Sequence, residues 1–204
     1  MASVVERTTL QPGTSEYEEV KTLFNRSNQS RGNCLRALSI EKVHNSYLEQ
    51  RFQAKKQEYQ RDFGQVEVLK LWHGTRGAYV DNILLNNYDV SRHGQGVGHR
   101  FGAGISFSGQ SGYASNYCDN DDIDCMLLND VLVSNIIEVE ENRGGSVLRE
   151  PPLLPGHFAL RYDTTAKNKV IKNVIVKYES DACLPTHVVM FTRHAVVDCD
   201  SDCD

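Results

Sequence analysis

The sequence predicts an α+β domain with a mostly antiparallel sheet, on the basis of two patterns along its 204 residues. Apolar residues recur at helical spacing before Gly64, whereas short β-rich runs separated by turn residues dominate after it. Helices followed by strands, rather than an alternation of the two, are typical of α+β domains. The length fits one domain with a sizeable core, and no internal repeat or interior linker is visible.

The first helix is predicted to begin at Thr14 or Ser15, either of which is a good N-cap residue. Acidic residues follow in the first turn, and three apolar residues have the spacing of one buried face: Tyr17, Val20 and Phe24. Residues 28–33, NQSRGN, read as a loop.

A long amphipathic helix is predicted within residues 40–64, ending near Gly64. Its apolar face contains Ile40, Val43, Tyr47, Leu48, Phe52 and Tyr59. The start of this segment, residues 40–43, is equally compatible with a strand that leads into the helix.

The second part of the chain opens with a predicted strand, residues 66–72, followed by a helix over residues 77–88 with Val80, Ile83 and Leu84 inward. Residues 89–104 hold five glycines in sixteen positions, which excludes a regular element. Further strands are predicted at 126–140, 157–162, 172–178 and 186–193, with a proline-stiffened connection at 149–156.

Composition excludes several classes of protein. The net charge of −5 does not indicate nucleic-acid binding, and no apolar run approaches the roughly 18 residues of a membrane-spanning helix. No Cys-x-x-Cys pair has a matching partner, so we expect no metal site. The N-terminus lacks the apolar core of a secretory signal, which favours a cytoplasmic or nuclear location.

Three places in the sequence are candidates for a ligand site. The first is His73-Gly74-Thr75, directly after a predicted strand. A histidine there offers a directional hydrogen-bonding ring, Gly74 permits close approach of the backbone to a ligand, and Thr75 adds a hydroxyl. Taken alone, a His-Gly-Thr triplet is a weak signal.

The second candidate is the glycine-rich loop, where cations such as Arg92 are suited to pairing with a pyrophosphate; a plain surface loop is an equal alternative. The third is the stretch FGAGISFSGQSGYASNYC, residues 101–118. Its Tyr113 and Tyr117 either stack on an aromatic ligand or pack in the core.

The order of these motifs, LWHGTR, a helix, a glycine-rich loop, FGAGISF and GYASNYC, resembles that of the diphtheria-toxin-like ADP-ribosyltransferases. It is more closely similar to the catalytic domain of the poly(ADP-ribose) polymerase family. LQPGTSEYEEVKTLF, IEKVHNSYLEQRFQAKK and KYESDACLPTHVVMF resemble the family's opening, second and closing segments. The resemblance implies a flexible N-terminus over residues 1–8, an ADP-ribosyltransferase domain over 9–194 and an acidic tail over 195–204.

The resemblance also implies two mostly antiparallel sheets that form a cleft for NAD, with the N-terminal helices packed alongside. His73 would hydrogen-bond the adenosine ribose with Thr75 nearby, Gly74 would bind the nicotinamide carboxamide, and Tyr117 would stack on the nicotinamide. Arg92 would cover the adenine–pyrophosphate end. Phe107 and Tyr113 complete the expected contacts, and the glycines at 102 and 104 would let the backbone approach the dinucleotide.

Three positions depart from the family's pattern. Ser106 replaces a tyrosine that lies on the nicotinamide's other face, and Ala114 replaces the serine that bonds the carboxamide, with Ser115 next to it as a substitute. Together these two changes are expected to weaken binding by on the order of 2 kcal/mol, or about thirtyfold. Val174 replaces the glutamate of the chain-forming polymerases, so His73, Ser106 and Val174 occupy the catalytic triad positions.

The resemblance implies NAD-dependent transfer of a single ADP-ribose to a protein or other macromolecular acceptor, the protein itself included. A single unit is expected because an apolar residue at position 174 is typical of members that add one unit. The alternative is a catalytically weak or inactive domain that binds NAD, ADP-ribose or a protein partner. Ser106 and Ala114 favour the second reading, and His73-Gly74-Thr75 with Tyr117 favours the first.

Overall fold

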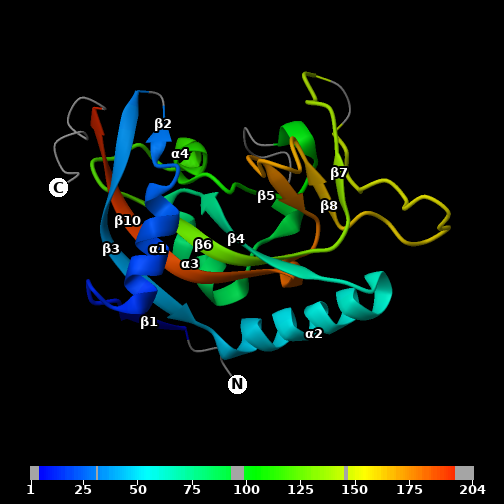
Figure 1. Ribbon diagram of the computed structural model, residues 1–204, viewed down its shortest axis with the longest axis horizontal. Coiled ribbons are helices and arrows are strands. Elements are labelled where there is room, and N and C mark those ends of the chain that lie inside the picture. The colour runs from blue at the N-terminus through cyan, green and yellow to red at the C-terminus, as the bar shows by residue number, and fades with distance from the viewer. Residues whose placement is uncertain (1–4, 31, 93–98, 145–146, 196–204) are drawn as a thin grey trace.

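The computed structural model describes residues 5–30, 32–92, 99–144 and 147–195. Its strands form two sheets (Figure 1). The larger sheet has the order β1-β3-β10-β6-β4, with β2 added to β3. Its strands are β1 (Glu6–Thr9), β2 (Gln29–Ser30), β3 (Asn33–His44), β4 (Glu67–Gly74), β6 (Asp124–Val133) and β10 (Cys183–Ala195).

The smaller sheet has the order β5-β9-β8-β7. Its strands are β5 (Ile105–Phe107), β7 (Ile136–Glu138), β8 (Thr164–Ala166) and β9 (Ile175–Lys177). Of the described strand pairs, only β7 and β8 run parallel. The predicted α+β class with mostly antiparallel sheet is therefore confirmed.

A short bridge joins the two sheets next to the candidate site. The backbone N–H of Trp72 in β4 donates to the carbonyl of Ser108 at 2.7 Å, and the N–H of Ser108 donates back at 2.9 Å. Because Ser108 directly follows β5, this bridge holds the end of β4 against β5. The residue after Trp72 is His73, so the joint between the sheets fixes the candidate histidine.

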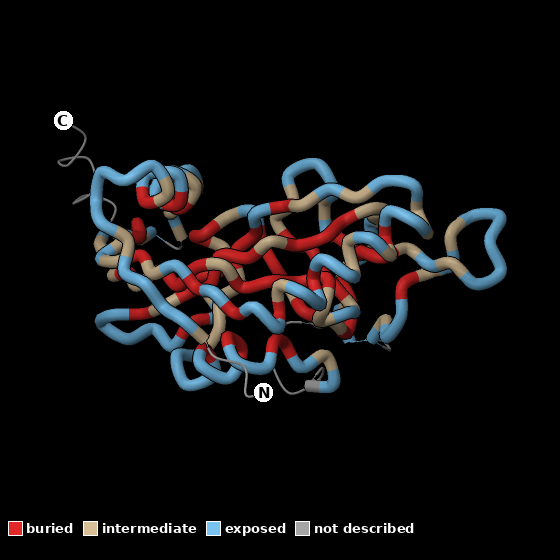
Figure 2. Tube along the Cα trace, turned by 90° about the horizontal axis from the view of Figure 1, so that it is seen from below, coloured by how far each residue is buried: buried red, intermediate tan, exposed pale blue. Residues whose placement is uncertain are grey.

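Helices cover both faces of the larger sheet. Their bounds are α1 (Ser15–Asn25), α2 (Ser46–Phe63), α3 (Gly77–Asn86) and α4 (Ser111–Ala114), with 3₁₀ turns η1 (Val90–Arg92), η2 (His99–Phe101), η3 (Ser115–Tyr117) and η4 (Ser180–Ala182). The inward residues of α1 pack in one apolar cluster with Trp72 and Phe191. Those of α2 and α3 pack in another with Leu71 and Val188, so buried residues run through the middle of the molecule (Figure 2). In the described residues no helix combines the length and the apolar character needed to cross a membrane.

The two sequence alternatives for residues 40–43 are resolved in favour of the strand. Ile40 pairs with Val189 of β10 inside β3, and the helix begins only after Asn45. The Asn45 side chain accepts hydrogen bonds from the N–H groups of Tyr47 and Leu48, both at 3.2 Å, which satisfies two of the helix's free donors. Tyr47 is consequently exposed rather than inward, whereas Leu48 and the later apolar residues of α2 are buried.

The first helix follows the prediction, with Thr14 at the N-cap position and its three apolar residues buried. Its cap differs in detail, because the Thr14 hydroxyl donates backwards to the carbonyl of Gln11 at 2.8 Å. The predicted loop at 28–33 contains β2, which pairs with the start of β3. The segment expected to be a flexible N-terminus contains β1, whose side chains are all exposed and so give no apolar signal.

The predicted strand at 157–162 is wrong. This segment lies in a projection between β7 and β8, in which Leu153 and Arg161 form an isolated bridge and Phe158 is fully exposed (Figure 1). Its apolar residues give it the composition of a strand, but its backbone hydrogen bonds go to residues 152–154 of the same projection and not to a strand of either sheet. The sheet instead takes up the polar Thr164–Ala166 as β8, which the sequence did not indicate. The acidic tail after Ala195 lies outside the described residues.

Candidate functional site

His73 lies near the end of β4 with its ring held in one orientation. Its Nδ1 is 2.9 Å from the backbone carbonyl oxygen of Ser106. Because a carbonyl only accepts hydrogen bonds, Nδ1 carries the proton in this contact and Nε2 is left as an acceptor. Tyr88 and Phe107 support the ring from two sides, with ring centroids 4.9 Å and 5.5 Å from that of His73.

The surroundings of His73 keep the ring neutral. Burial lowers the pKa of His73 to about 4 and outweighs the hydrogen bond to the Ser106 carbonyl, which acts in the opposite direction. A neutral ring at physiological pH presents Nε2 to a hydroxyl donor, such as one of a ribose. Thr75 follows directly, and its hydroxyl makes no hydrogen bond with the part of the chain that the structure describes.

Gly74 is explained by the close approach of α4. A Cβ atom at this position would lie 1.9 Å from the carbonyl oxygen of Ala114 and 3.2 Å from the Cβ of Tyr117. Any side chain here would therefore push α4 and η3 away from β4. The glycine of the histidine motif thus lets α4 and η3, with Tyr117, lie directly against the end of β4.

Tyr113 and Tyr117 form a pair on the same side of α4 and η3. Their ring centroids are 5.8 Å apart at an interplanar angle of 53°, and their hydroxyl oxygens are 3.2 Å apart. Tyr117 is 38% exposed, so it is a surface residue rather than a core one. Tyr113 is half-buried against the apolar cluster of Phe101, Val174 and Val176, and burial raises its pKa.

The glycines of the FGAG turn have a structural reason that differs from the expected one. Gly102 has a φ of +137°, and a Cβ atom there would lie 1.9 Å from the hydroxyl oxygen of Tyr178. A Cβ at Gly104 would lie 2.2 Å from the carbonyl oxygen of Lys177. The turn is thus packed tightly against the end of β9, which is sufficient to require both glycines without a dinucleotide.

The glycine-rich loop is described only at its ends. Arg92 ends η1 and its side chain, like residues 93–98, lies outside the described residues. The regular parts are the short turns η1 and η2, in agreement with the prediction of an irregular segment. The role expected for Arg92 at the pyrophosphate stays a prediction.

A family model for the poly(ADP-ribose) polymerase catalytic domain matches residues 14–152 of the chain. The chain belongs to this PARP catalytic-domain family. The matched range includes His73, the FGAG turn and both tyrosines, so the features described above lie within it. Two sheets with mostly antiparallel pairing agree with the fold expected for a PARP domain.

Curated relatives are distant and carry the name protein mono-ADP-ribosyltransferase. Human PARP12 is 28% identical over 190 residues, covering 92% of this chain and 26% of PARP12. Mouse PARP11 is 25% identical over 205 residues, covering 89% of this chain and 59% of PARP11. Mouse PARP10 is 22% identical over 183 residues, covering 88% of this chain and 19% of PARP10. The chain thus spans less than two thirds of each relative's own length.

The three departures from the PARP pattern differ in their surroundings. Ser106 is the central residue of β5, and its carbonyl fixes His73. Val174 is 3% exposed and fully enclosed by apolar neighbours. Ala114 is 3% exposed in the cluster around Trp72. Each position holds a residue that fits its local packing.

Ser115 does not take the place of the missing serine at position 114. It is 1% exposed, and its hydroxyl donates to the carbonyl of Gly112 in the preceding turn at 2.9 Å. Phe107 also differs from expectation, because it is 2% exposed and packs in the core beneath His73. Alternation along β5 turns Phe107 inward, where it supports the His73 ring, and its expected contact with NAD stays a prediction.

Two residues near the site were not indicated by the sequence patterns. Tyr88 packs against His73 and donates its hydroxyl hydrogen bond to Asn129 at 2.6 Å, so both ring and hydroxyl are fixed. Arg193 donates to the carbonyl of Ser115 at 2.9 Å and pairs with the buried Asp124, which anchors the turn that carries Tyr117. Tyr88 stands directly before the glycine-rich loop, a position that could have drawn attention to it.

Within the described ranges, one acidic group has a geometry that a metal ion could use. Carboxylate oxygens of Asp119, Asp121 and Asp124 lie within 4.8 Å of one another. Asp119 accepts the N–H of Gly77 at 2.7 Å, and Asp124 pairs with Arg193. These protein contacts account for two of the three carboxylates, and the absence of a metal stays a prediction.

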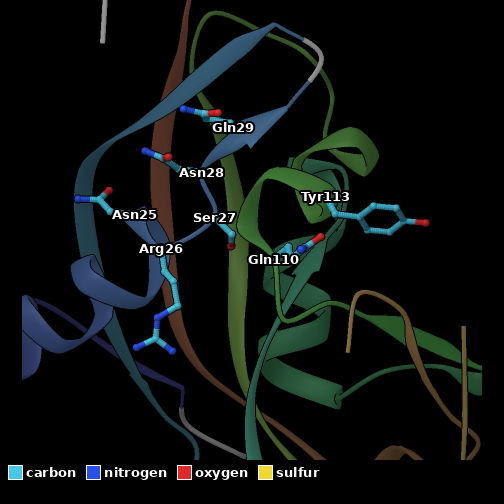
Figure 3. Close-up of a pocket in the computed structure, with 7 residues that line it drawn as sticks. All are labelled: Asn25, Arg26, Ser27, Asn28, Gln29, Gln110 and Tyr113. Carbon is cyan, nitrogen blue, oxygen red and sulfur yellow. The ribbon is translucent and has the colours of Figure 1, made fainter. Parts of the chain in front are cut away.

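A surface pocket of about 430 Å³ lies between the end of α1, β2 and the start of α4. It is lined by Asn25, Arg26, Ser27, Asn28, Gln29, Gln110 and Tyr113. Figure 3 shows that these side chains do not converge: Arg26 and Tyr113 point in different directions. The walls of this pocket are held by hydrogen bonds from Gly112 N–H to Ser27 and from Ser111 to Phe24, which dock α4 on α1.

Proposed function

We propose that this domain binds NAD and transfers a single ADP-ribose to a protein acceptor, releasing nicotinamide. The observation that carries the proposal is the neutral, fixed ring of His73, with Nδ1 bonded to Ser106 and Nε2 directed away as an acceptor. A ribose hydroxyl is a suitable donor for Nε2, and a fixed ring positions the substrate without losing rotational freedom on binding.

The reaction needs geometry more than proton transfer. The bond between the ribose anomeric carbon and the nicotinamide nitrogen breaks, and its electron pair neutralises the pyridinium nitrogen. A nucleophile on the acceptor then forms the new bond to that carbon. Gly74 would hold the carboxamide through its backbone, and the exposed ring of Tyr117 would stack on the nicotinamide.

Transfer of one unit follows from Val174. In its apolar cluster, position 174 offers no acceptor for a hydroxyl of a growing chain. The relatives are named protein mono-ADP-ribosyltransferase, which supports the same interpretation for this chain. A cytoplasmic or nuclear location remains part of the proposal.

A second candidate function is favoured by the nicotinamide end of the site. Ser106 removes an aromatic wall, and neither Ala114 nor the inward-turned Ser115 supplies the carboxamide's hydroxyl partner. These features suit a domain that binds NAD or ADP-ribose weakly, or binds a protein partner, without turnover.

The experiment that separates the two functions is incubation with NAD labelled in its adenylate part. Wild-type protein is expected to label itself or an added acceptor, with intact mass showing one ADP-ribose per site. His73→Ala should lose the label, whereas His44→Ala, which changes an exposed histidine paired with Glu49, should keep it. If no label is incorporated and millimolar NAD gives no thermal shift, the proposed enzymatic function is wrong. Products that carry more than one ADP-ribose unit per site would contradict only the inference of single-unit transfer from Val174.

A further inference from the structure

The direction of the Ser106 side chain follows from its place in β5. Its strand neighbours Ile105 and Phe107 both point into the main core. Alternation therefore turns Ser106 to the opposite face, which it shares with its cross-strand partner Val176. The serine side chain on this face is much smaller than the tyrosine of the family pattern.

Tyr113 lies over that same face although it comes from a different element. Its ring packs against the cluster that contains Val176 and Val174. Figure 3 shows the ring directed away from the other six residues that line the surface pocket, so its neighbours are the small sheet and Tyr117. An aromatic ring supplied by α4 rather than by β5 thus packs on the sheet face to which Ser106 belongs.

We propose that Tyr113 is the second aromatic wall of the nicotinamide slot and that the small side chain of Ser106 makes room for it. The inference rests on the proposed NAD-binding function and specifies how its aromatic end is built. A flat ring stacked between two others needs about 7 Å between them, since each contact takes roughly 3.5 Å. The tyrosine rings are 5.8 Å apart and tilted, so Tyr113 moves towards Ser106 when a ligand enters.

This arrangement makes the two positions mutually exclusive. A tyrosine at position 106 would occupy the volume into which Tyr113 withdraws, so Ser106→Tyr alone should not strengthen binding. In a Tyr113→Ala background the same substitution should strengthen nicotinamide binding, because the new tyrosine ring can then stack on the nicotinamide in place of Tyr113. The sign of the effect of Ser106→Tyr therefore depends on the residue at position 113.

The test measures the dissociation constant of nicotinamide for the whole chain by calorimetry, in a double-mutant cycle of Tyr113→Ala and Ser106→Tyr. Tyr113→Ala is expected to weaken binding roughly twofold to tenfold, the range of one aromatic contact. Ser106→Tyr should leave binding unchanged or weaker, and the double variant should return to the wild-type affinity or better. Tyr47→Ala, which removes an exposed tyrosine on α2, is the matched control and should bind as wild type.

Additive effects of the two substitutions overturn the proposal, as does the absence of nicotinamide binding in every variant. If Tyr113→Ala does not fold, Tyr113→Leu keeps apolar packing without an aromatic face, and Tyr113→Phe keeps the ring. Leucine should weaken binding and phenylalanine should not; equal binding by both overturns the proposal. If the double-mutant cycle behaves as predicted but no acceptor is ever labelled, the proposed transferase activity is wrong and the proposed role of Tyr113 stands. If an acceptor is labelled but the two substitutions act additively on nicotinamide binding, only the proposed role of Tyr113 is wrong.

Discussion

Replacing Gly74 by alanine tests whether the histidine motif positions α4. The added Cβ would lie 1.9 Å from the Ala114 carbonyl oxygen and 2.8 Å from its carbonyl carbon, both backbone atoms that cannot rotate away. A carbon–oxygen contact needs about 3.3 Å, so β4 and α4 would have to separate by roughly 1.4 Å. Overpacking of this kind costs about 1–3 kcal/mol. For a domain of this size the melting temperature should fall by about 2–12 °C.

The same displacement should affect the ligand site more strongly than it affects stability. Tyr117 moves with α4, and a misplacement of about 1 Å in a positioning residue can cost on the order of a hundredfold in rate. Gly77→Ala is the matched control, because a Cβ there meets its nearest atoms at ordinary distances of 3.6 Å and 3.9 Å. Thermal unfolding and labelling by NAD are measured for both variants. A Gly74→Ala protein that melts and labels like Gly77→Ala would refute the reasoning.

Two further predictions concern charge. The pKa of His73 is lowered from 6.5 to about 4 in the folded protein. Between these two pH values the unfolded chain binds a proton that the folded protein does not bind. The free energy of unfolding is therefore at its full value above pH 6.5 and decreases as the pH falls towards 4. Urea unfolding at pH 7.5 and pH 5 should therefore show a larger loss of stability in wild type than in His73→Gln; equal losses contradict the assignment. Lys177 pairs with Asp163 at 2.7 Å with both side chains buried, so Lys177→Met leaves a buried carboxylate without its counter-charge, although Ser134, Asn135 and Thr164 still donate to it, and should cost about 3–5 kcal/mol in chemical denaturation. Lys42→Met, at the exposed pair with Glu16, should cost at most about 1 kcal/mol, and similar values for the two would count against a buried charge pair.

The elements that the sequence predicted well are those whose apolar residues are buried on one side. The periodicity of Val80, Ile83 and Leu84 predicted α3, and the β-rich run ending at Trp72 predicted β4. Periodicity failed where pairing rather than burial makes the strand. β1 has only exposed side chains, and the Thr164–Ala166 strand is polar, so neither differs from a loop in composition. The apolar segment 157–162 fails for the opposite reason, since it has the composition of a strand but pairs only with residues 152–154 and not with either sheet.

The candidate site was predictable to the extent that it depends on motifs. Gly74 and Tyr117 lie together because β4 and α4 meet at a position where only a glycine fits, so the residue type itself indicates the close approach. The directions of side chains were not predictable from spacing alone. Ser115 turns to its own helix, and Phe107 turns to the core beneath His73. The direction of Ser115 depends on a carbonyl three residues earlier, which is available only once α4 has formed, and the neighbours of Phe107 come from β4, far away in the chain.

The structure also changes how the departures from the PARP pattern combine. Adding the losses of binding free energy expected at Ser106 and Ala114 assumes that the two positions act independently. Ser106 shares a sheet face with Val176, against which Tyr113 packs together with Val174, so a change at position 106 is coupled to the residues at 113 and 174. Contacting residues do not contribute additively. Ala114 lies in a different cluster, around Trp72, and its effect should remain independent. The loss of binding free energy at the nicotinamide end is therefore expected to be smaller than the sum of the two separate losses, by the amount that Tyr113 restores. The missing hydroxyl at position 114 then accounts for the larger part of the weakened binding.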